Sequence, residues 1–194
     1  MSPRPRTIDD EEILAATGRV IGRVGPAKLT LALVAEEVGL APATLVQRFG
    51  SKRGLLLSLG RSGRSSGGGY VAKLRAQHGS PLVVLREFLL CFAAMAKTPD
   101  ELANHLAAFH LDLVDPELRE LTRELAVDNE STVAELIQEA IDAGEMKGCS
   151  PKRLAPVLLT VAQGSLLAWA VFRKGSARRW AARHIDTALE PYLA

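Results

Sequence analysis

The sequence is poor in aromatic residues, and this shortage narrows the possible folds. Phe, Trp and Tyr make up 5% of the 194 residues, whereas apolar residues together reach 47%. A core of this size that draws mainly on Ala and Leu favours helices over sheets. No segment alternates apolar and polar residues as a half-buried strand does. The sequence therefore predicts an all-α fold.

Cysteine is also scarce. Cys91 and Cys149 are the two in the chain, which excludes a disulfide framework, and no spacing of Cys and His is typical of a zinc site. His105 and His110 are five residues apart and do not share a helix face well, so they make a poor metal pair. We expect no metal or cofactor, and a reduced, cytoplasmic setting.

Motifs of catalysis are missing as well. No G-x-S-x-G sequence places a nucleophile beside a base, and no G-x-x-x-x-G-K-[ST] sequence forms a nucleotide loop. These missing motifs argue against an enzyme.

The first residues also lack the apolar region of a signal peptide.

One long apolar run tests for a membrane segment. Residues 154–172 carry no charge and are long enough to span a bilayer. Gln163, Gly164 and Ser165 lie at the centre of the run, Pro156 interrupts its start, and no aromatic belt marks both ends. We expect this helix to be buried inside the protein or between subunits, with no membrane partner.

Basic residues are concentrated near one end. Residues 1–64 contain ten Lys and Arg against six Asp and Glu, a surplus of +4 in a chain whose net charge is +2. This asymmetry indicates a polyanionic partner for the N-terminal part.

Helix signals follow one another along the chain. Asp9 and Glu12 form a capping box for a helix that we expect to end at Gly25-Pro26. Thr30 and Ser51 have the character of N-caps for two further helices, and Pro42 that of a first helical residue for the one between them. Longer apolar helices are expected over residues 81–96, 100–114, 115–144, from about 151 to 172, and 176–193.

The segment Thr30 to Leu56 predicts a helix-turn-helix, in which one helix is held so that it can enter the major groove of DNA. With Leu45 and Phe49 turned inward, four side chains are expected to face outward and two more to lie at the margin, within reach of phosphates. The outward four are Pro42, Ala43, Val46 and Gln47, and the marginal two are Thr44 and Arg48. The competing interpretation is a plain helical bundle in which this geometry is incidental.

Two stretches, "EEILAATGRVIGRVGPAKLT" and "VAEEVGLAPATLVQRFGSKRGLL", resemble the TetR family of transcriptional repressors. The resemblance implies a DNA-binding domain over residues 1–56, with phosphate contacts from Thr30 and Lys52 and a backbone or base contact from Thr44. Val46 and Arg48 stand where the family often has Tyr and either His or Tyr, so the operator sequence does not carry over. Arg4 and Arg6 are candidates for a minor-groove arm or for a solvated tail.

For residues 57–194 the resemblance implies a domain that binds a small-molecule effector and forms a homodimer. The expected dimer is a four-helix bundle built from residues 152–174 and 176–193, with Gly164, Ser165 and Ala168 allowing close approach and Leu166 and Trp169 filling the seam. The candidate effector contacts are Phe88, Phe92, Met95, His105 and Phe109. The competing interpretation is that they are ordinary core residues, with His105 a satisfied core or surface histidine.

The function implied is a repressor that binds a palindromic operator as a dimer and is released by a small-molecule effector. Two alternatives remain open, namely a DNA-binding regulator without such an effector, and an α-helical enzyme or interaction module.

The segment Gly60 to Gly69 contains five glycines. It lies in the fourth expected helix, which in the family connects the two domains. Each glycine inside a helix costs roughly 0.8–1 kcal/mol relative to alanine. We predict a soft helix, frayed or kinked here or broken near Gly67–Gly69, whose softness affects the coupling between the effector and DNA sites.

Overall fold

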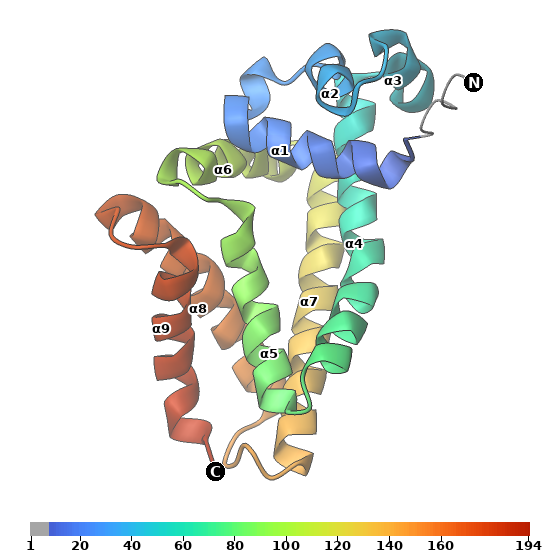
Figure 1. Ribbon diagram of the computed structural model, residues 1–194. Coiled ribbons are helices and arrows are strands. Elements are labelled where there is room, and N and C mark those ends of the chain that lie inside the picture. Colours follow the sequence, from blue (N-terminus) through green and yellow to red (C-terminus); the bar gives the residue numbers. More distant parts are fainter. Residues whose placement is uncertain (1–7) are drawn as a thin grey trace, which may run out of the picture.

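A computed structural model of the chain describes residues 8–194, with the side chains of residues 64–66 left aside. Within these residues the chain is helical and contains no strand, and an isolated bridge joins Met146 to Leu193 (Figure 1). The prediction of an all-α fold is confirmed. Arg4 and Arg6 lie outside the described residues.

The helices follow in the order α1 Asp10–Lys28, α2 Leu31–Val38, α3 Pro42–Phe49, α4 Lys52–Gln77, α5 Pro81–Leu90, η1 Cys91–Met95, α6 Pro99–Val114, α7 Pro116–Asp142, α8 Pro151–Phe172, α9 Ala177–Leu189 and η2 Glu190–Tyr192.

Buried apolar residues form two clusters. The first joins α1, α2, α3 and the start of α4, and it includes the fully buried Ile13, Val34, Leu45 and Leu55. The second joins the lower part of α4 to α5, α7, α8 and α9. Figure 1 shows the first group of helices at one end of the molecule, with α4 leaving it and descending beside α7. We call these parts the N-terminal module (residues 8–56) and the body (residues 57–194).

The first helices begin where the sequence predicts. Asp9, Thr30 and Ser51 each accept a hydrogen bond from a backbone N–H three residues later. α1 extends to Lys28 rather than ending at Gly25-Pro26, but Gly25 has a φ of 76° and kinks it there. The helix expected over 81–96 also differs, because α5 ends at Leu90 and Cys91–Met95 form a 3-10 helix.

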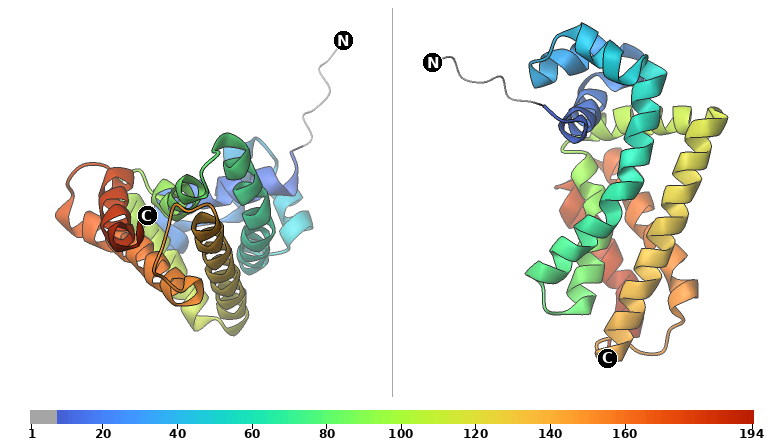
Figure 2. Two further views of the ribbon diagram at one scale, coloured as in Figure 1. Left: turned by 90° about the horizontal axis from the view of Figure 1, so that it is seen from below. Right: turned by 90° about the vertical axis from the view of Figure 1, so that its right-hand side faces the viewer.

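The glycine-rich segment is an uninterrupted part of α4, so the alternative of a helix broken near Gly67–Gly69 is wrong. Packing against α7 explains part of this continuity. A methyl group built on Gly60 would lie 3.2 Å from Cδ1 of Leu121, and one on Gly63 would lie 3.7 Å from Cδ2 of Leu125. These glycines therefore let α4 and α7 lie close together (Figure 2).

Among residues 8–194, α8 is the helix whose length and composition match those of a membrane span. Its most apolar window has a mean hydropathy of 1.7, and 44% of that window is buried inside the protein. Its buried face includes Ser165, Leu166 and Trp169, which are 6%, 5% and 2% exposed within the single chain. The expectation that Leu166 and Trp169 fill a seam between subunits is therefore wrong, because both side chains complete the core of their own chain.

Candidate nucleic-acid interface

α3 presents one open face to solvent. Leu45 is fully buried beneath it and Phe49 is half-buried, whereas Val46 is 51% exposed. The four residues predicted to face outward, Pro42, Ala43, Val46 and Gln47, are exposed. Of the two predicted at the margin, Thr44 is half-buried and Arg48 is exposed. Thr30, at the start of α2, is exposed as well. A short helix with this open face has the shape that the major groove accepts.

Two tight turns fix the position of α3. Gly39 ends α2 with a φ of 70°, and the backbone N–H of Leu40 returns to the carbonyl of Ala35 at 2.8 Å. Pro42 then begins α3, and Gly50 ends it with a φ of 71°. Because these positive φ angles suit glycine, the sequence itself sets the angle of α3 to α2 at Gly39 and to α4 at Gly50.

Gly54 brings α4 against the end of α3. A methyl group on Gly54 would overlap the carbonyl oxygen of Phe49, a backbone atom that has little freedom to move away. Sequence reasoning missed this requirement, since a glycine in the first turn of a helix carries no signal of what it faces.

The two predicted cations of the interface are already engaged inside the module. Lys52 donates from Nζ to the carbonyl oxygen of Pro26 near the end of α1. Arg48 donates from Nη1 to the carbonyl of Ile8 at 2.8 Å and to the Asp10 carboxylate at 3.2 Å, at the start of α1. Both side chains therefore hold α3 and α4 against the two ends of α1.

α2 is also tied to α1 through charge. Arg19 and Arg23 donate to the Glu37 carboxylate at 3.2 and 2.8 Å. The hydrogen bonds from Arg23 and then Arg19 lower the pKa of Glu37, so this carboxylate stays ionised.

The five candidate effector contacts occupy three settings. Phe88 is buried in the core of the body, where its ring centroid lies 6.4 Å from that of Tyr70, and Phe92 packs half-buried on the same core. Met95 and Phe109 are 50% and 44% exposed. His105 lies against α1, at the junction between the module and the body.

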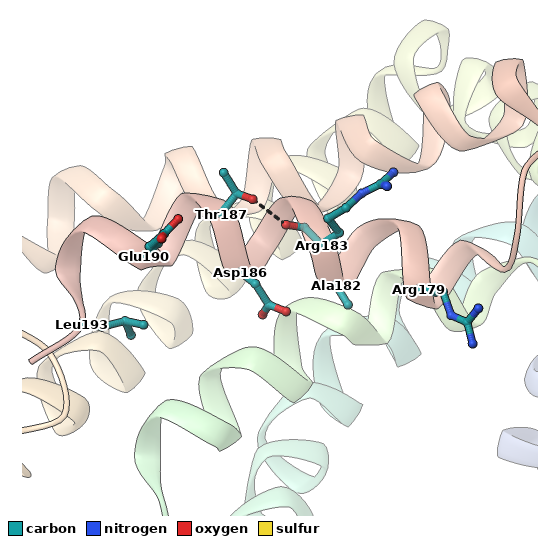
Figure 3. A pocket seen from close by; sticks show the side chains of 7 residues that line it. All are labelled: Arg179, Ala182, Arg183, Asp186, Thr187, Glu190 and Leu193. Carbon is teal, nitrogen blue, oxygen red and sulfur yellow. Dashed lines mark hydrogen bonds between the residues drawn. The ribbon is translucent and has the colours of Figure 1, made fainter.

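A shallow groove runs along the outer face of α9 (Figure 3), and it was not among the predicted sites. Acidic and basic side chains mix along it, and Asp186 is already paired with Arg86 of α5 at 2.6 Å. The lining residues are Arg179, Ala182, Arg183, Asp186, Thr187, Glu190 and Leu193. This mixture gives the groove no single ligand chemistry.

Comparison with known proteins gives a family-model match near the N-terminus and a fold for the chain. Residues 13–59 match the model of the bacterial regulatory proteins of the tetR family. The comparison with curated proteins gives no match.

Solved structures resemble the chain over nearly its whole length. One is a TetR transcription regulator from Haloarcula marismortui ATCC 43049, with a TM-score of 0.74 and 18% identity, covering 95% of this chain and 98% of that one. Another is a putative transcriptional regulator from Saccharomonospora viridis in complex with choline, with a TM-score of 0.71, 21% identity and coverages of 95% and 97%. A third is the transcriptional regulator FadR from Bacillus subtilis in complex with stearoyl-CoA, with a TM-score of 0.65, 17% identity and coverages of 93% and 98%. The resemblance indicated by the sequence is confirmed.

Proposed function

We infer that the chain is a transcriptional regulator of the TetR family, and we propose that it is a cytoplasmic repressor that binds a palindromic operator as a homodimer. In this proposal residues 1–56 read DNA and residues 57–194 bind a small-molecule effector and the second subunit. The observation that carries the proposal is the open face of α3, held by fixed turns within the segment that matches the family. Such a protein acts by binding and not by catalysis.

The exposed side chains of α3 suit base contacts. An amide such as that of Gln47 can bond to the two major-groove groups of an adenine, and the methyl groups of Val46 can pack on a thymine methyl. Thr30, Thr44, Arg48 and Lys52 surround this face and are assigned to the DNA backbone. Lys52 begins α4, where the helix N-terminus adds its own positive potential for a phosphate.

The dimer is assigned to α8 and α9. α8 carries a second stripe, on the side away from the core, in which alternate spacings of three and four residues produce a bundle-like seam. Its members Val157, Thr160, Gly164, Leu167 and Val171 are all exposed, with Leu167 49% and Val171 79% exposed. A second copy on this stripe would explain why so apolar a face remains open in one chain. A two-fold dimer places its recognition helices about 34–36 Å apart on DNA, which requires a palindrome.

An effector within the body is supported by the ligands that relatives hold, which are choline in one and stearoyl-CoA in another. These two molecules differ in size and in polarity, so the relatives favour a ligand site without identifying its ligand. Phe88, Phe92, Met95, His105 and Phe109 remain the proposed effector contacts, and because they occupy three settings each is to be tested on its own.

DNA binding is tested by titrating the protein against the DNA upstream of its own gene and against random DNA at fixed salt. Gln47→Ala should weaken operator binding by about 1–3 kcal/mol and relax the preference at one base position. Lys52→Ala should weaken all sequences similarly and flatten the salt dependence. Wild-type binding that is no tighter to the upstream DNA than to random DNA, and that neither substitution changes, would contradict the proposed function.

Release by an effector is tested separately. A thermal-shift screen of small molecules identifies ligands that stabilise the protein, and each is then added to the protein–operator complex. Release of DNA at the concentration that saturates the thermal shift supports the repressor proposal. Ligands that bind tightly and leave operator affinity unchanged would argue for a regulator controlled in another way.

A further inference from the structure

Two glycines of α1 form a notch that receives two polar side chains of α6. Asn104 donates from Nδ2 to the carbonyl of Gly22 at 2.8 Å. The ring of His105 covers Gly22, because a methyl group built there would lie 2.9 Å from its Nε2. A methyl group on Gly25 would lie 2.8 Å from Oδ1 of Asn104. α1 and α6 lie side by side here, where the module meets the body (Figure 1).

The notch is specific to this part of α1. Gly22 and Gly25 are both buried, and Gly25 has a φ of 76°, which a larger residue rarely adopts. Gly18 lies one turn earlier on the same helix, and a methyl group there would meet no described atom within 4 Å. A methyl group is therefore tolerated at residue 18, whereas at residue 22 it would displace the ring of His105.

α1 is also the element to which the DNA-reading helices are attached. Arg48 of α3 and Lys52 of α4 hold its two ends, and Glu37 of α2 binds Arg19 and Arg23 on its side. A shift of α1 therefore carries α2, α3 and the start of α4 with it. Of the elements of the body, α6 is the one that meets α1 in the notch.

The contact is polar, which sets it apart from the packing around it. Ala108, one turn after Asn104, meets the module with an apolar side chain, as ordinary helix packing requires. Asn104 and His105 are half-buried, and the hydrogen bond of Asn104 demands a defined direction as well as a distance. Polar groups in such a place fix orientation, and they separate at lower cost than an apolar contact because water can replace the lost bond.

We propose that Asn104 and His105 are positioning residues that set the angle of the recognition helix relative to the body by seating in the Gly22–Gly25 notch of α1. The proposal rests on the proposed function and adds to it a contact through which the body controls operator affinity. Neither residue touches DNA, so their effect reaches operator binding through α1.

The test compares Gly22→Ala with the matched control Gly18→Ala. Operator and random-DNA affinities are measured at fixed salt, together with Tm. Gly22→Ala should displace His105 and weaken operator binding about tenfold while leaving random-DNA binding within about twofold. Gly18→Ala should keep both affinities within about twofold of wild type.

Two further variants separate seating from general damage. The double variant Gly22→Ala with His105→Ala makes room for the new methyl group and keeps the bond of Asn104, but it loses the contact of His105. Its operator affinity should therefore lie between that of Gly22→Ala and that of wild type. Asn104→Ala removes the hydrogen bond without adding bulk, and it should weaken operator binding by about threefold or more. This variant keeps the proposal testable if Gly22→Ala does not fold.

The outcomes distinguish this proposal from the one on which it rests. Wild-type protein without preference for the upstream DNA overturns the proposed function. Wild-type preference that persists unchanged in Gly22→Ala and Asn104→Ala overturns the positioning role alone. Equal losses on operator and random DNA, or a double variant no better than Gly22→Ala, overturn it as well.

Discussion

Gly68→Ala should stabilise the protein, because the structure places this glycine in a continuous helix with free space beside it. Gly68 is exposed, and a methyl group there would meet no atom of the described residues within 4 Å. The full difference in helix propensity, about 0.8–1 kcal/mol, is therefore available. For a chain of this size it corresponds to a rise in Tm of about 2–4 °C.

Gly60→Ala is the matched comparison within the same helix. Its methyl group would lie 3.2 Å from Cδ1 of Leu121, so the same gain in propensity is offset by crowding against α7. Thermal unfolding followed by circular dichroism, with urea titration as a second measure, gives both free energies. An unchanged or lowered Tm for Gly68→Ala, or an equal gain for Gly60→Ala, would refute the assignment of these glycines to an open and a packed face of α4.

Three other changes test the electrostatics and the close approaches. Burial lowers the pKa of His105, so the folded state favours the neutral ring, and the free energy of unfolding should fall as the pH drops below about 6.5. Unfolding measured across this pH range should show a smaller loss in His105→Gln and the full loss in the control His110→Gln. Burial raises the pKa of Asp112 to about 6, so its ionised form destabilises the fold above that pH. Asp112→Asn should raise the free energy of unfolding by about 1 kcal/mol at pH 7.5, after allowance for screening by water, and should leave it unchanged at pH 3.5. An equal gain at both pH values would contradict the raised pKa of Asp112. Gly54→Ala should destabilise the α3–α4 junction by about 1–3 kcal/mol, since Phe49 cannot withdraw its carbonyl, and a Tm equal to that of wild type would show that the junction relaxes freely.

The fold of the module could be predicted because its signals are local. An N-cap such as Thr30, the glycine that closes α2 and the proline that opens α3 each act on their own turn, and the structure keeps all three. The open face of α3 follows from the same local period, since Leu45 inward leaves Val46 and Gln47 outward.

The errors arose where a partner helix decides the outcome. Leu166 and Trp169 lie in a helix with two apolar faces, and the sequence does not say which face turns to its own core and which stays open for a second chain. The continuity of α4 at its glycines depends in part on Leu121 and Leu125, which are some sixty residues away in sequence.

The notch on α1 was missed for the same reason. Gly22 and Asn104 are ordinary residues in their own helices, and their meaning appears once the two helices are placed side by side. His105 was expected as a candidate effector contact, and the structure gives it a neighbour, Gly22, that no local pattern indicates.

The bonds that Arg48 and Lys52 make within the free protein affect the entropy of DNA binding. A lysine or arginine that is free in solution loses about 2 kcal/mol of side-chain entropy when it is fixed on a phosphate. Here both side chains are already restrained by carbonyl groups of Ile8 and Pro26, so part of this ordering takes place during folding. An ammonium group has three protons, and the one that Lys52 gives to Pro26 leaves two for a phosphate. In the proposed complex, each cation thus serves both as a cross-link of the module and as a phosphate contact, and binding releases counterions with little new order in the protein.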